Sequence, residues 1–234
     1  MKQNPQKSKT DRPLSPAEVA LLLPVILFLL LPVLFFGWYG STYLPVTQKS
    51  EIHARELVIS QGGSRCTLDI PAGTLTLRRP QRAALGSSYR FKAQVQLERP
   101  LRFINCTGAI PNWNISLEAQ TALVSSNVKP FSAIRQPAFD QDHFTYAWDF
   151  TPEERIPRYQ SHFWLRAIVS GKDQTVENWN ILVRDFPMEN ISFFGMPAVI
   201  GVVISGFSLV FGLLFLILLL QKRHQKRNKD HPNI

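Results

Sequence analysis

The sequence predicts a membrane protein in which two transmembrane helices flank an all-β domain, an antiparallel β-sandwich. Two apolar segments without charged residues lie near the ends of the chain, from Val19 to about Tyr39 and from about Pro197 to Leu220. Each is long enough to cross a bilayer core of roughly 30 Å as a helix. Several short runs between them alternate apolar with polar residues, as strands with one buried face do.

These features divide the 234 residues into five predicted parts. The middle part, of about 150 residues, suits one domain with a core of its own. The predicted parts are a cytoplasmic tail (1–18), a first transmembrane helix (19–43), an extracytoplasmic β domain (44–192), a second transmembrane helix (193–220) and a cytoplasmic basic tail (221–234).

The formal net charge of +9 is concentrated at the two ends of the chain. Residues 1–20 carry +2 and residues 221–234 carry +4, which leaves only +3 for everything between them. Basic residues beside membrane helices tend to stay cytoplasmic, so both termini are predicted inside and the central domain outside. Because no basic face of a folded domain can be isolated in the sequence, we expect no nucleic-acid partner.

The second apolar segment is followed by five basic residues, which are predicted to lie at the membrane surface and mainly to fix the topology. Contact with anionic lipid is the alternative. A bacterial cytoplasmic membrane is the expected location, since the sequence shows no elaborate targeting signal; a eukaryotic membrane is the alternative. The five residues are Lys222, Arg223, Lys226, Arg227 and Lys229.

The first apolar segment contains Pro24 and Pro32, each of which removes a backbone donor. A membrane tolerates such breaks where neighbouring groups satisfy the freed carbonyls, so this helix is predicted to pack against something. A cleaved signal peptide is the alternative, but the apolar run is longer than a signal core. Neither segment contains an ionisable residue, which argues against an ion or proton pathway.

The second apolar segment carries small residues spaced four apart, a pattern that lets helix backbones approach closely. Its partner is the first helix, a second copy of the chain or another subunit. The alternative is that glycine and serine are simply common in membrane spans. The predicted packing residues are Gly201, Ser205, Ser208 and Gly212.

The strand pattern is clearest from Tyr89 to Leu97, where every second residue is apolar and the intervening ones are polar. About eight short strands with turn residues between them favour an antiparallel sandwich. The other predicted strands are Trp113–Ala119, Phe144–Phe150, Phe163–Val169 and Trp179–Val183, with weaker ones at Leu57–Ile59, Cys66–Ile70 and Leu75–Leu77.

The stretch Phe144–Pro152, followed by Ser161–Ala167 and Trp179–Val183, resembles the closing strands of an immunoglobulin-like sandwich. The resemblance implies a fold and no function. Both cysteines precede this region, so the chain departs from the Cys…Trp…Cys arrangement of antibody domains.

Cys66 and Cys106 are the only cysteines, and in an exported domain they are predicted to form one disulfide. Two buried free thiols are the alternative. The sequence has no Cys-x-x-Cys and no Cys/His metal spacing, so neither a metal nor a cofactor is expected.

The chain has no phosphate loop, dinucleotide fingerprint, zinc-protease helix or nucleophile elbow. An enzyme hypothesis depends on His143, His162 and nearby acids, which would approach one another if their two strands pair. The basic group Arg78, Arg79 and Arg82 is expected in a solvated loop; contact with anionic lipid headgroups or an acidic partner is the alternative.

We therefore expect a non-enzymatic membrane protein whose outer domain binds or assembles with a partner, as an accessory subunit of a membrane complex. The expected partners are membrane lipid and either another membrane protein or an extracytoplasmic protein. Binding is expected at the irregular stretches Asn127–Gln141 and Thr151–Tyr159, and at Trp164 if it is exposed. The alternatives are a transmembrane sensor acting through a cytoplasmic partner and a membrane-tethered enzyme.

Overall fold

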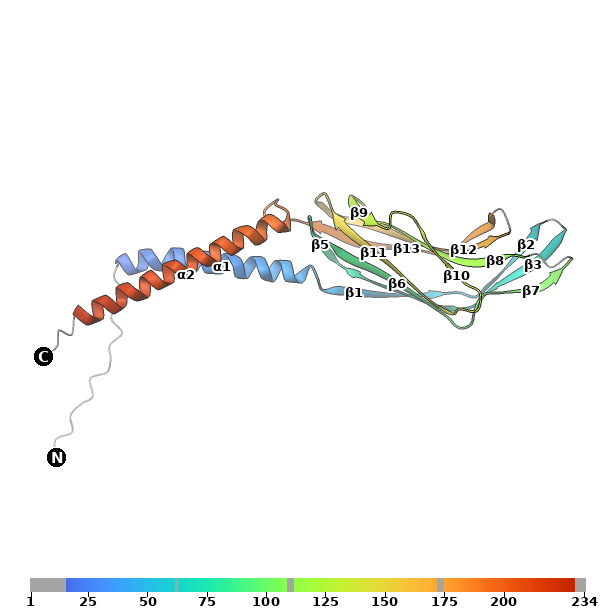
Figure 1. Ribbon diagram of the computed structural model, residues 1–234, viewed down its shortest axis with the longest axis horizontal. Coiled ribbons are helices and arrows are strands. Elements are labelled where there is room, and N and C mark those ends of the chain that lie inside the picture. The colour runs from blue at the N-terminus through green and yellow to red at the C-terminus, as the bar shows by residue number, and fades with distance from the viewer. Residues whose placement is uncertain (1–15, 62, 109–111, 172–174, 230–234) are drawn as a thin grey trace, which may run out of the picture. The chain divides into compact units, whose positions relative to one another are not determined.

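The computed structural model describes residues 16–61, 63–108, 112–171 and 175–229. The chain folds as two compact units (Figure 1). The helical unit comprises the chain up to Gly37 together with the chain from Ile200 onward, and the β unit comprises Trp38–Val199.

Two helices, α1 (Pro16–Ser41) and α2 (Ala198–Lys229), lie near the ends of the chain. Within them, Leu22–Ser41 and Ala198–Gln225 are long and apolar enough to cross a membrane. Pro24 and Pro32 lie inside α1, as the sequence indicates. The helix α2 continues to Lys229, so the basic residues after Leu220 extend the helix.

Thirteen strands occur in the described residues. The predicted eight are all among them, several with shifted or longer bounds. The strands are β1 (Pro45–Ile52), β2 (Arg55–Gln61), β3 (Ser64–Ile70), β4 (Gly73–Pro80), β5 (Arg82–Ala84), β6 (Tyr89–Leu97), β7 (Arg102–Thr107), β8 (Asn114–Ala122), β9 (Ser126–Lys129), β10 (Ile134–Pro137), β11 (His143–Pro152), β12 (Ile156–Ser170) and β13 (Thr175–Ile191).

The strands form three sheets. The first sheet has the order β1-β4-β6-β11-β9, the second has the order β10-β8-β12-β13-β5, and the distal sheet has the order β2-β3-β7. Neighbouring strands are antiparallel, apart from the parallel pair of β13 with β5. Figure 1 shows the distal sheet at the end of the β unit opposite to β5. The prediction of a mostly antiparallel β domain between two apolar helices is confirmed.

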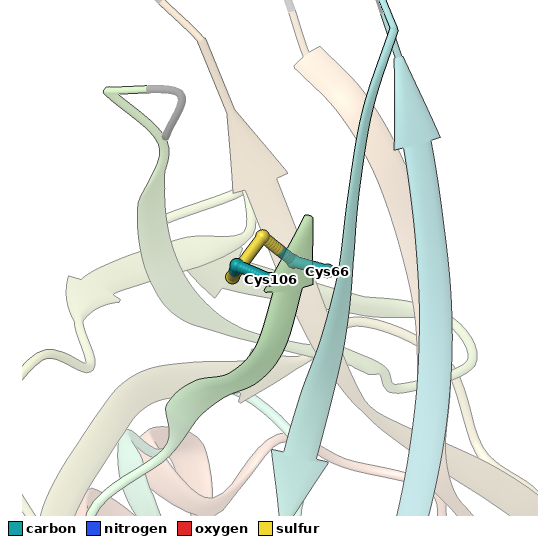
Figure 2. Close-up of a disulfide and its surroundings, with 2 residues drawn as sticks. All are labelled: Cys66 and Cys106. Atoms are coloured by element: carbon teal, nitrogen blue, oxygen red, sulfur yellow. A yellow bond between two sulfur atoms is a disulfide. The ribbon is translucent and has the colours of Figure 1, made fainter. Parts of the chain in front are cut away.

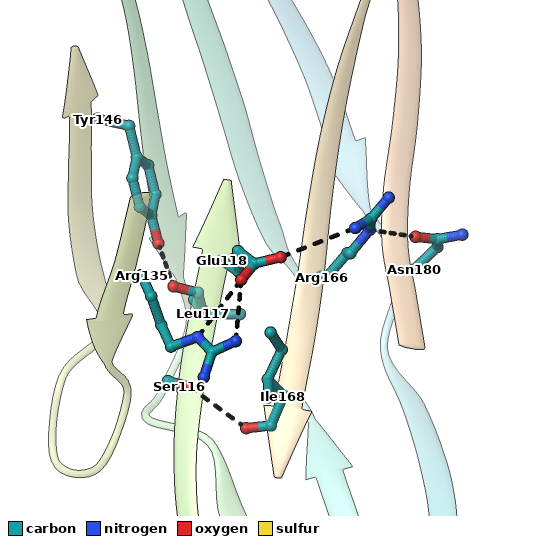
Figure 3. Close-up of polar contacts among 8 residues, drawn as sticks. All are labelled: Ser116, Leu117, Glu118, Arg135, Tyr146, Arg166, Ile168 and Asn180. Atoms are coloured by element: carbon teal, nitrogen blue, oxygen red, sulfur yellow. Dashed lines mark hydrogen bonds and ion pairs between the residues drawn. The ribbon is translucent and has the colours of Figure 1, made fainter. Parts of the chain in front are cut away.

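The first and second sheets pack face to face through aromatic side chains. The ring of Phe91 on β6 lies 5.3 Å from that of Phe186 on β13, and the ring of Trp148 on β11 lies 6.2 Å from that of Phe163 on β12. The hydroxyl of Tyr146 donates a 3.2 Å hydrogen bond across the interface to the carbonyl of Leu117 (Figure 3). These four aromatic residues, with Tyr146, are almost completely buried and form the centre of the core.

The residues predicted to point inward are buried on β6, β8, β11 and β12. On β13 only some of them are buried. Ile181 is buried whereas Val183 is 45% exposed. The pairing of β12 with β13 shifts register between Leu165 and Arg166, which leaves Ile181 without an opposite residue. Such a bulge reverses the alternation beyond it, so that Phe186 and Met188 point into the core instead.

The outer face of the second sheet carries a row of polar contacts across four adjacent strands (Figure 3). Glu118 on β8 lies 3.1 Å from Arg135 on β10 and 3.7 Å from Arg166 on β12. Arg166 in turn donates to the side chain of Asn180 on β13 at 3.1 Å. Because the arginines are partly exposed, the row contributes little free energy per contact.

In the distal sheet, a disulfide between Cys66 on β3 and Cys106 on β7 cross-links two adjacent strands (Figure 2). The predicted disulfide is thus present, and the alternative of two free thiols is wrong. Arg55 of β2 ties this sheet to the second one by donating to the carbonyls of Asn180 and Ile181, at 3.1 Å and 2.6 Å.

Candidate functional site

The turn between β5 and β6 holds the last turn of α1 and the first residue of α2. The hydroxyl of Tyr39, near the end of α1, lies 3.1 Å from that of Ser87. The amide of Ala198, where α2 begins, donates to the carbonyl of Leu85 at 3.0 Å. One turn therefore contacts both ends of the β unit's chain. We call this region the base.

A chain of hydrogen bonds fixes the segment that follows α1 to strand β6. The hydroxyl of Thr42 donates to the carbonyl of Tyr39 at 2.7 Å, so its oxygen accepts from the hydroxyl of Tyr89 at 2.8 Å. The amide of Ala84 then donates to the Tyr89 oxygen at 2.9 Å. Burial raises the pKa of Tyr89, which keeps the phenol neutral and able to donate.

A groove of about 430 Å³ opens beside the base, where strands β4 and β6 part. Their pairing ends at Arg78 and Lys92, although β4 continues to Pro80. Tyr43 lines the groove from the segment after α1. We call it the basic groove because exposed Arg78, Arg90 and Lys92 line it.

Within the part of the chain that the structure describes, only one of these cations, Arg90, is paired with an acid. Arg90 donates to both carboxylate oxygens of Asp149, at 2.7 Å and 3.0 Å. This hydrogen bonding lowers the pKa of Asp149, so the carboxylate is ionised across the neutral range. Arg78 and Lys92 form no ion pair within the described ranges.

Arg79 also borders the groove but is buried between the sheets, with 4% of its surface exposed. Its guanidinium carbon is 4.7 Å from the centroid of the Phe186 ring, and Nη1 donates to the carbonyl of Pro80 at 3.3 Å. Its Nε has no hydrogen-bond partner in the structure. Burial therefore lowers the pKa of Arg79. Among the described residues no carboxylate pairs with this buried guanidinium, so its burial costs folding free energy.

The predicted basic group is thus divided by the fold. Arg78 is exposed at the groove, Arg79 is buried, and Arg82 pairs with Glu189 at 3.1 Å. Sequence reasoning missed Arg90 and Lys92, which reach the groove through pairing with distant strands. The only available signal was their position on the polar side of an alternating run.

The predicted binding stretch Asn127–Gln141 crosses from one sheet to the other. It contains most of β9, which pairs with β11 of the first sheet, and all of β10, which pairs with β8 of the second. Phe131 is 92% exposed and Phe139 is 64% exposed. Phenylalanine is enriched at protein interfaces, so two largely exposed phenylalanines on one segment suit burial against a partner. We call this stretch the crossing segment.

The other two predicted recognition elements are less prominent. The stretch Thr151–Tyr159 is shared between the end of β11 and the start of β12. Trp164 is only half-buried, and its ring lies 5.7 Å from that of His162.

The two histidines of the enzyme hypothesis do not come together. His143 lies on β11 and His162 on β12, and these strands belong to different sheets, so the expected pairing is absent. His162 instead contacts Asp185 at 2.6 Å on an exposed surface. Within the described residues, no three side chains of metal-ligating type cluster together.

The predicted packing residues of α2 lie against α1 within the helical unit. Gly201, Ser205, Ser208 and Gly212 are all buried. A Cβ atom at Gly201 would overlap the ring of Phe35, and one at Gly212 would come within 2.8 Å of Leu29. The first helix of the same chain is therefore the partner of these residues in this structure.

The basic residues near the end of α2 are described only in part. Lys222 and Arg223 are exposed on the last turns of the helix. Lys226, Arg227 and Lys229 belong to α2, and their side chains lie outside the described part of the structure.

No protein-family model matches the sequence, and no curated protein matches it. The architecture alone defines the class of the protein: a β unit of two facing sheets between two apolar helices of transmembrane length.

Proposed function

We propose that this chain is a non-enzymatic integral membrane protein that presents its β unit for binding or assembly on the outer face of a membrane. Its role is that of an accessory subunit of a membrane complex, and its partner is another membrane protein or an extracytoplasmic protein. The membrane is the bacterial cytoplasmic one, with both termini inside.

Three features support the membrane location. Both helices contain stretches of transmembrane length, and the chain ends carry the largest share of the positive charge. The disulfide between Cys66 and Cys106 fits an oxidising compartment for the β unit.

The observation that carries the binding role is the exposure of Phe131 on the crossing segment. Aromatic residues account for much of the binding energy at protein interfaces, whereas in water they only expose apolar surface. The strands on either side are hydrogen-bonded into different sheets, so the segment is held in place before any partner arrives. Such pre-organisation lowers the entropy lost on binding.

We also propose that the β unit is immunoglobulin-like. Strands β6, β11 and β9 are neighbours in one sheet, while β8, β12 and β13 are neighbours in the other. These orders correspond to strands B-E-D and C-F-G of that fold. Strand β4, beside β6, takes the place of strand A, so the additions are β1, β5, β10 and the distal sheet. The disulfide joins β3 to β7 rather than the two main sheets.

The test is a site-specific crosslink. A photoreactive residue replaces Phe131 in the tagged full-length chain, which is irradiated in intact cells and purified in detergent. A defined companion should crosslink from position 131. A crosslinker at Val58, which is 51% exposed on the distal sheet, is the matched control and should capture no such companion.

The same companion should be lost from native co-purification when the chain carries F131S and F139S, and kept when it carries V58S. All three side chains are largely exposed, so the substitutions should leave the unfolding midpoint unchanged. A companion retained by the F131S/F139S chain would place the assembly surface elsewhere.

A transmembrane sensor remains the second candidate, and the base is the observation that favours it. Because one turn contacts both Tyr39 and Ala198, a change in the β unit would reach both helix ends together. That role needs a cytoplasmic partner, so removal of residues 221–234 should abolish the signal without releasing the extracytoplasmic companion.

A further inference from the structure

Two positive side chains face each other across the strands that border the basic groove. Arg78 and Lys92 are opposite residues in the β4–β6 register. Like charges in directly opposite positions destabilise a sheet. The next pair on the same face, Thr76 with Gln94, is neutral, so the charges are placed at the groove rather than along the sheet.

The groove keeps a net positive charge after ion pairing within it. Asp149 pairs with Arg90 through two short hydrogen bonds. That leaves Arg78 and Lys92 without a carboxylate among the described residues, on the border of an opening of about 430 Å³. A guanidinium and an ammonium group on one opening suit the oxygens of a phosphate, the first through paired hydrogen bonds and the second as a point charge.

The chain itself places this groove near the end of a membrane-length helix. Tyr43, which lines the groove, follows Ser41, the last residue of α1, by two positions. Two residues span at most about 7 Å. The headgroup layer on each side of a bilayer core is about as thick, at roughly 5–8 Å. A phosphate that reaches this groove from a lipid therefore has only a short distance to cover.

We propose that the basic groove binds the phosphate of an anionic lipid headgroup, with Arg78 and Lys92 contacting the phosphate oxygens. This inference rests on the membrane location given under the proposed function. It adds a specific lipid-binding site on the β unit, separate from the basic residues at the end of α2.

The test uses the full-length chain in nanodiscs that contain phosphatidylcholine, with or without phosphatidylglycerol. Lipids retained after gentle release are identified and counted by native mass spectrometry. The wild-type chain should retain phosphatidylglycerol selectively, and R78Q/K92Q should weaken that selectivity about tenfold or more. The charge-matched control is R65Q/R184Q, since both residues are exposed outside the groove, and its selectivity should stay at the wild-type level.

A further variant separates the groove from the helix end. K222Q/R223Q should lose phosphatidylglycerol independently of R78Q/K92Q, so that combining the two pairs has an additive effect. Unchanged selectivity in R78Q/K92Q would overturn the groove as a lipid site. Displacement of the bound lipid by millimolar glycerol phosphate would overturn the lipid as its natural source and assign the groove to a soluble phosphate compound.

The two proposals fail in distinguishable ways. A wild-type chain that does not enter nanodiscs would overturn the membrane location, and the lipid site with it. A chain that enters them and recruits its extracytoplasmic companion, but shows no preference for phosphatidylglycerol, would overturn the lipid site alone.

Discussion

The hydroxyl of Ser208 on α2 donates a 2.9 Å hydrogen bond to the backbone carbonyl of Phe28 on α1. In an unbroken helix this carbonyl would accept from the amide four residues later, but that residue is Pro32. The serine therefore supplies the donor that the proline removes. An apolar span containing a proline is tolerated because the neighbouring helix satisfies the freed group.

This relationship predicts a conditional effect of removing the hydroxyl. S208A should destabilise the chain in detergent by about 1 kcal/mol, the usual value for a hydrogen bond between membrane helices. In a P32A background the alanine amide can bond to Phe28 itself, so S208A should then cost much less. Thermal unfolding of the four chains in the cycle measures the difference.

Ser205 provides the control, because its buried hydroxyl oxygen has no partner in the structure. S205A should leave the midpoint unchanged or raise it slightly in either background, because it removes a buried hydroxyl that lacks a hydrogen bond. Equal losses from S208A with and without Pro32 would contradict the role assigned to the hydrogen bond.

Alanine substitutions at Gly201 and Gly206 on α2 should change stability in opposite ways, because the two glycines have different surroundings. In G201A the new methyl group would overlap the Phe35 ring, which is fully buried and cannot move aside freely. Overpacking of this kind costs about 1–3 kcal/mol. G206A meets no atom within 4 Å and should be neutral or slightly stabilising, because alanine favours a helix over glycine.

Thermal unfolding of both variants in the same detergent tests this prediction. An equal loss of stability in G201A and G206A would show that the loss does not come from the contact between α1 and α2.

The disulfide should stabilise the β unit through its effect on the unfolded chain. Cys66 and Cys106 are 40 residues apart, and closing a loop of that length is expected to contribute about 4 kcal/mol. C66A/C106A should therefore lower the urea midpoint by a corresponding amount. Reductant should lower the wild-type midpoint and leave that of the double alanine chain where it is.

The alternation of residues from Tyr89 to Leu97 was enough to predict both a strand and its buried face, because every odd position is apolar. Strand β1 was missed because its half-buried positions include Gln48 and Ser50, which interrupt the apolar pattern. β1 is an edge strand of the first sheet, and its formation depends on pairing with β4. Edge strands hold polar residues that local periodicity cannot assign.

The candidate site was harder to predict because it depends on pairing between distant segments. Arg78 and Arg79 are neighbours in sequence, yet alternation along a strand sends them to opposite faces. Lys92 joins Arg78 only through the β4–β6 register, which the sequence does not specify. The sequence shows that Pro32 removes a backbone donor from α1. That Ser208 replaces this donor can be seen only when the two helices are packed together.

Three tyrosines of the β unit with raised pKa values predict a loss of stability in alkali. Burial, with hydrogen bonding to Tyr39, raises the pKa of Tyr43 to about 12, and burial raises those of Tyr89 and Tyr159 as well. An unfolded chain releases these protons near pH 10. The folded chain therefore binds more protons above that value, so its stability is fully present below about pH 10 and falls as the pH rises toward 12.

Two measurements on the full-length chain in detergent check this expectation. Phenolate absorbance should rise in a late step, well above pH 10, that Y43F reduces in amplitude, and the urea midpoint should fall over the same range. In Y43F the urea midpoint should fall less steeply with pH but should still fall, since Tyr89 and Tyr159 are still present. Ionisation of all tyrosines in one step near pH 10, before any unfolding, would mean that the base does not shield these phenols.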